Sequence, residues 1–253
     1  MNLYYRELGQ GNPPIVILHG VFGSSDNWFT VSKELAETHK IYLLDARNHG
    51  QSPHTDEFNY DIMADDLLEF INQHQLFKPI IIGHSMGGKT VMKFAVKYPD
   101  AFSKMVVVDI SPRYYKPHHQ IIIAGLTAIP IDNLKTRQEA DDILKTVEPE
   151  LGVRQFLLKN IYRNEENGFS WRMNFEVIKN KIENIGEALE EGAKITKPTL
   201  FVRGANSKYI QEKDIELIHT IFSDVSIVTV EGSGHWVQAE KPKAFLEAVK
   251  AFL

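Results

Sequence analysis

The segment Gly83-His84-Ser85-Met86-Gly87 constrains the fold of this chain more than any other. Its G-x-S-x-G pattern follows the apolar run 79–82 and opens a stretch with helical periodicity, a combination typical of a nucleophile elbow. A strand that turns sharply into a helix needs glycine on both sides of the serine, because side chains there would clash. Ser85 would then stand at a helix N-terminus, where unpaired N–H groups favour developing negative charge. The pattern therefore predicts Ser85 as a nucleophile.

A competing interpretation covers the same loop. Residues 83–90 also fit G-x-x-x-x-G-K-[ST], the pattern of a loop that cradles phosphates. Asp109, after the apolar run 105–108, resembles the strand-end aspartate that holds Mg²⁺ in such proteins. From these residues alone, a serine hydrolase and a P-loop-like nucleotide-binding protein both stay open.

Composition narrows the classes of partner. The formal net charge of -5 gives no basic footprint for nucleic acid, so a small-molecule substrate is favoured. The absence of cysteine excludes disulfides, thiolate nucleophiles and cysteine-based zinc sites. The first residues lack the pattern of a signal peptide, and no apolar run approaches the ~18 residues of a membrane span. We therefore expect a cytoplasmic protein without a membrane span.

Short β-branched runs alternate with helical periodicity along most of the chain, which predicts an α/β fold with a mostly parallel central sheet flanked by helices. Apolar spacing predicts helices over 61–74 and 241–252. The expected strands span residues 3–8, 15–18, 41–45, 79–82, 105–110, 199–203 and 225–230.

The alternation stops after Ile110 and resumes only at Thr199. Three helix-like segments, 134–147, 152–162 and 175–189, lie between, with no convincing strand among them. We therefore expect a core made of residues 1–111 and 197–253, and a helical insertion over 112–196.

An acyl-transfer site needs backbone donors for an oxyanion. The strand 15–18 ends in the glycine-rich loop 19–23, and ligands of parallel sheets bind at the carboxyl ends of strands. Such a loop can present a backbone N–H toward the serine, beside the N–H of the residue after the nucleophile. The expected donors are the backbone N–H groups of Val21 and Met86. Phe22 is the neighbouring alternative to Val21.

The base is expected beyond the last strand of the core, if the order along the chain is nucleophile, acid, histidine. His235 lies there, in the loop Glu231-Gly232-Ser233-Gly234-His235-Trp236. The pair His118-His119 lacks carboxylates at metal-ligand spacing, and we assign no metal.

Together these motifs resemble the α/β-hydrolase superfamily from end to end. The resemblance rests on His19-Gly20, the segment 45–52, the elbow and Gly234-His235-Trp236, which occur in the family's order. Within the superfamily, the segments 45–52 and 83–90 and Val108-Asp109-Ile110-Ser111-Pro112 look like the YbfF-type bacterial esterases.

The resemblance implies an α/β-hydrolase fold with a helical lid at the insertion. It implies a hydrolase that cleaves esters or thioesters of small to medium acyl chains through an acyl-enzyme, without a cofactor. It disfavours the phosphate-binding interpretation, which leaves His19-Gly20 and Gly234-His235 unexplained. A non-catalytic ligand receptor on the same scaffold stays open, because a fold does not dictate function.

The chain departs from the family's pattern at the acid. Most of the superfamily places it three residues after the glycine that matches Gly204, and here that residue is Ser207. Asp109 is the natural substitute, because its strand should end beside the nucleophile strand. The alternative is that Asp109 only caps the following turn; Asp214 and Asp224 are weaker stand-ins.

Further expectations concern the surroundings of the site. Phe22 and Trp236 are expected to line the acyl pocket, although aromatic residues often serve packing alone. Asp45 and Arg47 are expected to pair beneath it. Activity is expected to rise with pH as the imidazole of His235 loses its proton.

Overall fold

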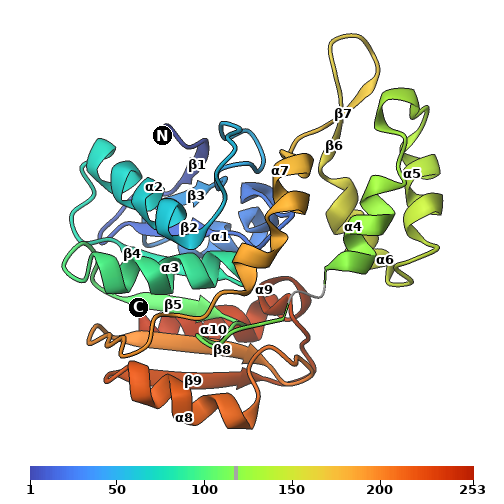
Figure 1. The fold of residues 1–253 in the computed structure, drawn as a ribbon. Coiled ribbons are helices and arrows are strands. Elements are labelled where there is room, and N and C mark those ends of the chain that lie inside the picture. Colours follow the sequence, from blue (N-terminus) through green and yellow to red (C-terminus); the bar gives the residue numbers. More distant parts are fainter. Residues whose placement is uncertain (117–118) are drawn as a thin grey trace.

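The computed structural model describes residues 1–116 and 119–253. In this part of the chain, seven strands form a sheet in the order β1-β3-β2-β4-β5-β8-β9 (Figure 1). Strand β1 runs antiparallel to β3, and every other neighbouring pair is parallel. The mostly parallel sheet is therefore confirmed. The strands are β1 (Tyr5–Leu8), β2 (Ile15–Leu18), β3 (Ile41–Leu44), β4 (Ile80–His84), β5 (Met105–Val108), β8 (Thr199–Gly204) and β9 (Val225–Val230).

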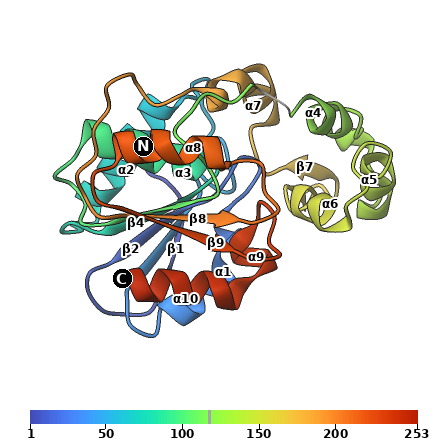
Figure 2. The ribbon, with the colours of Figure 1, turned by 90° about the horizontal axis from the view of Figure 1, so that it is seen from below.

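Helices cover both faces of the sheet. Helices α2 (Tyr60–Gln73), α3 (Met86–Lys97) and α8 (Glu212–Ile221) lie on one face, and α1 (Phe29–Leu35) and α10 (Pro242–Phe252) on the other (Figure 2). The short helix α9 (Val237–Glu240) precedes α10. The predicted helices 61–74 and 241–252 thus agree with α2 and α10 to within one residue.

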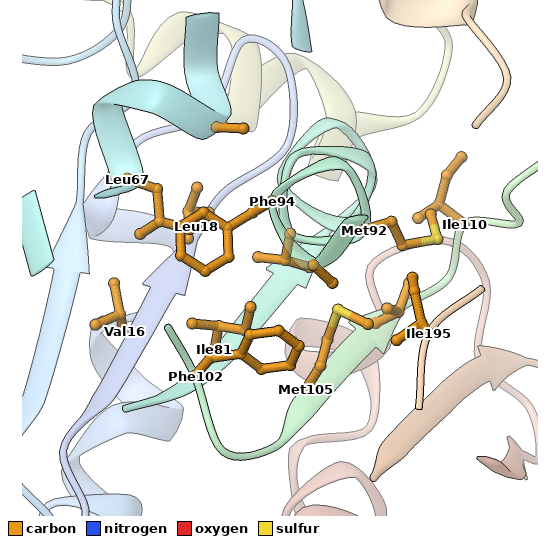
Figure 3. Close-up of a cluster of buried hydrophobic side chains, with 14 of the residues drawn as sticks. Val16, Leu18, Leu67, Ile81, Met92, Phe94, Phe102, Met105, Ile110 and Ile195 are labelled. Carbon is orange, nitrogen blue, oxygen red and sulfur yellow. The ribbon is translucent and has the colours of Figure 1, made fainter. Parts of the chain in front are cut away.

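The alternation of side chains along the strands builds two apolar layers. Val16 and Leu18 of β2 pack in the cluster beneath α2 and α3, whereas Ile15 and Ile17 pack with α1 and α10. Figure 3 shows the first layer, where Phe94 of α3 contacts side chains of the sheet. Because every residue of β2, β3, β4 and β5 is buried, these strands read as continuous apolar runs.

The segment 112–196, called the insertion segment below, lies outside the sheet (Figure 1). Most of its buried apolar side chains form a separate cluster that also takes in Phe22, Met63 and Met86 of the core, whereas Tyr115, Ala193 and Ile195 pack in the cluster beneath α2 and α3. The elements of the segment are α4 (Gln120–Thr127), η2 (Ile131–Asn133), α5 (Arg137–Leu144), α6 (Leu151–Leu158), β6 (Ile161–Arg163), β7 (Phe169–Trp171), α7 (Phe175–Asn180) and η3 (Ile182–Gly186).

The expectation that this segment contains no strand was wrong. Strands β6 and β7 form an antiparallel pair, and the helix expected over 152–162 ends at Leu158. The hairpin turns at Asn167-Gly168, where Asn167 has a φ of 63° and Gly168 receives a hydrogen bond from Asn164 N–H at 3.0 Å. Asn-Gly is a strong hairpin signal, and the sequence interpretation passed over it.

No helix of the described ranges 1–116 and 119–253 is long and apolar enough to cross a membrane.

Candidate active site

Ser85 stands at a sharp corner between β4 and α3. Its backbone has φ 54° and ψ -115°, a conformation that costs energy for any residue with a side chain. A Cβ at Gly83 would lie 2.1 Å from the carbonyl oxygen of Gly87, and a Cβ at Gly87 would lie 2.5 Å from that of Leu18. Both glycines are therefore required by close backbone approach, as the motif predicts.

The residues expected as oxyanion donors lie beside this corner. Met86 is the first residue of α3, so its N–H has no acceptor within the helix. The N–H of Phe22 donates to Nε2 of His49 at 3.2 Å and is thus engaged elsewhere. Val21, Phe22 and Ser85 line one cavity. Between the two candidate donors of the 19–23 loop, the geometry favours the N–H of Val21.

Two buried histidines hold this loop. Nε2 of His19 accepts a hydrogen bond from Ala46 N–H at 3.0 Å, and its Nδ1 donates to the carbonyl of Gly20 at 2.7 Å. Burial lowers the pKa of His19 to about 4 and that of His49 to about 3. Both rings are therefore neutral near pH 7, which suits their acceptor roles.

Asp109 and His235 are in direct contact. Nδ1–H of His235 donates to Oδ2 of Asp109 at 2.7 Å, although 126 residues separate them along the chain. Asp109 follows β5 with a φ of 48° and is fully buried. Its other oxygen, Oδ1, accepts the N–H of Gly204 at 3.1 Å. The carboxylate thus lies at the carboxyl ends of β5 and β8, where it fixes the imidazole.

Ser207 occupies the position where most of the superfamily carries its acid, and its hydroxyl donates to Oδ2 of Asp109. The sequence alone assigns no role to Ser207. In the structure the hydroxyl of Ser207 contacts the carboxylate of Asp109, which stands in for the acid that most of the superfamily carries at position 207. Both positions therefore contribute to one site.

Burial raises the pKa of Asp109 to about 6, because a carboxylate loses hydration in the interior. Hydrogen bonds from Ser207 and Gly204 act in the opposite direction, since they stabilise the charged form. At neutral pH Asp109 is therefore ionised and able to stabilise a positive charge on His235.

Tyr209 and His84 complete the surroundings of His235, and neither was singled out from the sequence. The ring of Tyr209 stacks on the imidazole with centroids 4.0 Å apart. Nε2–H of His84 donates to the carbonyl of His235 at 2.9 Å. No local pattern marks Tyr209, but His84 lies within the elbow motif itself.

A cavity of about 330 Å³ opens over these groups. Ser85, His235, Phe22 and Trp236 all line it, so the two aromatic residues expected at the pocket are found there. The insertion segment supplies most of the remaining wall from α4, α6 and the residues before α6. These residues are His119, Ile122, Glu148, Glu150, Val153, Phe156 and Leu157.

The amine of Lys89 is not directed to where the 83–90 loop would hold a phosphate group. Its Nζ is buried and donates to the carbonyls of Pro112, Arg113 and Glu187 at 3.1, 2.6 and 2.7 Å. Burial lowers the pKa of this amine to about 7. Pro112 and Arg113 open the insertion segment, and Glu187 lies toward its other end. The lysine therefore joins both ends of this segment to α3, and its amine is not available to a phosphate group.

The expected pair of Asp45 and Arg47 does not form. Arg47 makes a bidentate pair with Asp66 of α2, at 2.6 and 2.8 Å. Asp45 instead accepts the N–H groups of Ser25 and Gln51 at 2.6 and 2.8 Å. The carboxylate of Asp45 is thus used to hold turns, and the guanidinium finds a partner that is distant in the sequence.

Within residues 1–116 and 119–253, no group of three or more His, Asp and Glu side chains is arranged to hold a metal ion. His119 lines the cavity, and its neighbour His118 lies outside the described residues.

Comparison with known proteins now decides the family. The chain matches the family model described as the alpha/beta hydrolase fold over residues 13–242. It belongs to the α/β-hydrolase family.

Relatives of this α/β-hydrolase match over nearly its whole length. It is 38% identical to "Esterase YbfF" of Escherichia coli, over 96% of this chain and 93% of the relative. It is 39% identical to "sn-1-specific diacylglycerol lipase ABHD11" of Mus musculus, over 95% of this chain and 81% of the relative. The solved structure named "Marine microorganism esterase" has a TM-score of 0.97 and 42% identity, with 99% of each chain covered. The resemblance to YbfF-type esterases is therefore confirmed.

Proposed function

We propose that this α/β-hydrolase is a serine carboxylesterase in which Ser85, His235 and Asp109 form the catalytic triad. The observation that carries the proposal is the 2.7 Å hydrogen bond between His235 and a fully buried Asp109, in a site whose cavity Ser85 also lines. Relatives that are 37–39% identical support it, because they are named esterases or lipases.

In the first half of the reaction, Oγ of Ser85 attacks the acyl carbon and its proton passes to Nε2 of His235. The carboxylate of Asp109 stabilises the resulting imidazolium and holds the ring in orientation. The backbone N–H groups of Val21 and Met86 stabilise the oxyanion, each contributing about 3 kcal/mol to the transition state. The tetrahedral intermediate then expels the alcohol, which takes the proton from His235.

In the second half, water attacks the acyl-enzyme and gives its proton to His235. The second tetrahedral intermediate collapses, the proton returns to Ser85, and the carboxylic acid leaves. Every proton moves between groups already named, so the proposed cycle uses no cofactor.

The proposed substrates are esters, and thioesters by the same chemistry, with acyl chains of small to medium length. The apolar residues Phe22, Val153, Phe156 and Trp236 surround a cavity of about 330 Å³, which supports this range. We propose that the insertion segment acts as the lid over this pocket and belongs to a unit apart from the core of 1–111 and 197–253.

Two other functions are less well supported. Nucleotide binding is disfavoured because Nζ of Lys89 is engaged by three backbone carbonyls. A non-catalytic receptor would not need a histidine held between a buried carboxylate and the pocket, and the named relatives are hydrolases.

The test is hydrolysis of p-nitrophenyl acetate, butyrate and octanoate by the wild type and by Ser85→Ala. We expect kcat/KM to fall by about 10⁴-fold or more, because loss of a nucleophile leaves only residual catalysis. Ser226→Ala, on the exposed side of β9, is the matched control and should keep full activity. Undiminished hydrolysis by a folded Ser85→Ala variant would refute the proposal.

A further inference from the structure

A second hollow, of about 400 Å³, lies between the core and the insertion segment and is strongly cationic. It shares no lining residue with the cavity over Ser85. Four of its seven lining residues are basic and one is acidic. The lining consists of Arg6, Asp26, Phe29, Thr30, Arg137, Lys159 and Arg172.

The single carboxylate of the lining does not balance the cations. Asp26 pairs with Nη2 of Arg6 at 2.6 Å. Within the described residues, Arg137, Lys159 and Arg172 have no ion pair. Like charges gathered around one space repel each other, so the hollow favours an anion from solution.

Two of the arginines that line the hollow also carry donor groups without acceptors. In the described part of the chain, Nε of Arg6 and Nε of Arg172 are buried and make no hydrogen bond. Buried donors without partners are rare, and each such group calls for an explanation. The ring of Tyr162 lies 5.4 Å from Cζ of Arg172 and helps to orient this guanidinium.

The hollow lies where a ligand would join two parts of the molecule. Arg6 and Asp26 belong to the core, whereas Arg137, Lys159 and Arg172 belong to the insertion segment. Asn160, next to Lys159, donates from Nδ2 to the carbonyl of Phe22 at 2.7 Å, and the N–H of Arg172 donates to the carbonyl of Asn160 at 2.7 Å. The hollow is thus linked through Asn160 to the loop that lines the catalytic cavity.

We propose that this hollow binds a phosphate-bearing anion that bridges the core and the insertion segment. Guanidinium groups present paired N–H donors that match phosphate oxygens, and Lys159 adds a point charge. The hydroxyl of Thr30 and the ring of Phe29 offer contacts to the remainder of the ligand. The anion holds the insertion segment against the core beside Phe22, while the ester occupies the other cavity.

The experiment measures binding of pyrophosphate to the whole protein by calorimetry, with sodium chloride at matched ionic strength as the reference. We expect saturable binding that weakens about tenfold in Lys159→Gln and again in Arg172→Gln, since each removes a charge-assisted contact. Lys213→Gln, at an exposed position of α8, makes the same charge change away from the hollow and should bind as the wild type does. Unchanged affinity in both hollow variants would overturn the proposal.

Phosphate groups occur both in free metabolites and in lipid headgroups. A second experiment distinguishes these two sources. Co-sedimentation uses phosphatidylcholine vesicles with and without phosphatidic acid. Binding of pyrophosphate alone assigns the site to a free phosphate compound. Vesicle binding that needs phosphatidic acid and is weakened in Lys159→Gln assigns it to a headgroup. If neither pyrophosphate nor these vesicles bind, the proposal is wrong.

Discussion

The core and the insertion segment contribute to the cavity over Ser85 in different ways. The core supplies polar groups that follow β2, β4, β5, β8 and β9, and hydrogen bonds to neighbouring strand ends or loops hold them. The insertion segment supplies mainly apolar side chains from α4 and α6. The proposed chemistry therefore depends on the core, whereas the pocket wall is shared between Phe22 and Trp236 of the core and the side chains of the insertion segment.

The two regions are nevertheless tied together at defined points. Lys89 donates hydrogen bonds to carbonyls toward both ends of the insertion segment, and Asn160 donates one to the carbonyl of Phe22. The hydroxyl of Tyr60 donates to the carbonyl of Ile185 at 2.7 Å, and the N–H of Asn174 donates to the carbonyl of Asn48 at 2.8 Å. Polar contacts therefore position the segment, although its own cluster is apolar.

After Ser85→Ala, the largest effect is expected at the acid. Asp109→Asn should lower kcat by about 10⁴-fold, because an amide cannot stabilise the imidazolium and favours the wrong tautomer of His235. Steady-state hydrolysis of p-nitrophenyl butyrate measures the change. Asp224→Asn is the matched control, since Asp224 is exposed at the start of β9. A loss below about tenfold in Asp109→Asn would move the role of the acid to another residue.

A smaller effect is expected at Lys89, whose hydrogen bonds connect the core to the insertion segment. The amine of Lys89 has a pKa of about 7 in the folded protein, against 10.5 ordinarily. Between pH 7 and pH 10.5 the unfolded chain holds the proton of Lys89 more tightly than the folded protein does. The contribution of Lys89 to the free energy of unfolding therefore grows as pH rises and is lost as pH falls toward 7. The stability difference between the wild type and Lys89→Met should therefore grow by about 1–2 kcal/mol from pH 7 to pH 9.

Urea unfolding at several pH values measures this difference. Lys93→Met is the matched control, because ion pairs with Asp61 and Glu190 raise the pKa of Lys93 and remove any such gain in this range. A difference that stays constant or shrinks as pH rises would contradict the assignment.

The acid limb of the activity profile tests the core alone. The pKa of Asp109 is raised to about 6, so the carboxyl becomes protonated as pH falls below this value. Because Asp109 and His235 are hydrogen-bonded, the apparent pKa of the acid limb belongs to the pair and not to either residue alone. Below this pKa, kcat/KM should fall by about tenfold for each pH unit. Rates in a pH-stat check this, and constant activity between pH 7 and pH 5 would be incompatible with the proposed site.

The smallest effect is expected from the wall of the pocket. Phe156 lines the cavity and its ring lies 5.7 Å from that of Trp236. Phe156→Ala should raise the ratio of kcat/KM for octanoate over acetate by several-fold to about tenfold. This change alters the fit of the acyl chain in the pocket and leaves the catalytic groups unchanged. Ile121→Ala, at an exposed position of α4 outside the cavity, should leave the ratio unchanged. An equal loss for all chain lengths would place Phe156 in the chemistry instead.

The sheet and the convergence of its groups could be predicted from the sequence. Buried parallel strands give clear apolar runs, and their carboxyl ends meet at one edge. In the structure Asp109 contacts His235, and Ser85 lines the same cavity as His235. The glycines of the elbow have no substitute, so the motif specifies the backbone.

The insertion segment could not be predicted as well, because its elements are short and depend on contacts with distant residues. Helix α6 ends at Leu158 where the chain turns toward the β6–β7 hairpin, and strands of three residues carry almost no periodicity. The partner of Arg47 was missed for a related reason, since Asp66 comes close only when α2 packs on the sheet.

The most direct test of the triad is reaction with a fluorophosphonate probe, followed by mapping of the modified peptide by mass spectrometry. We expect a single adduct on Ser85, formed at least a hundredfold more slowly in Asp109→Asn because the histidine can no longer activate the hydroxyl. An adduct on another residue, or no adduct in a protein that hydrolyses esters, would contradict it.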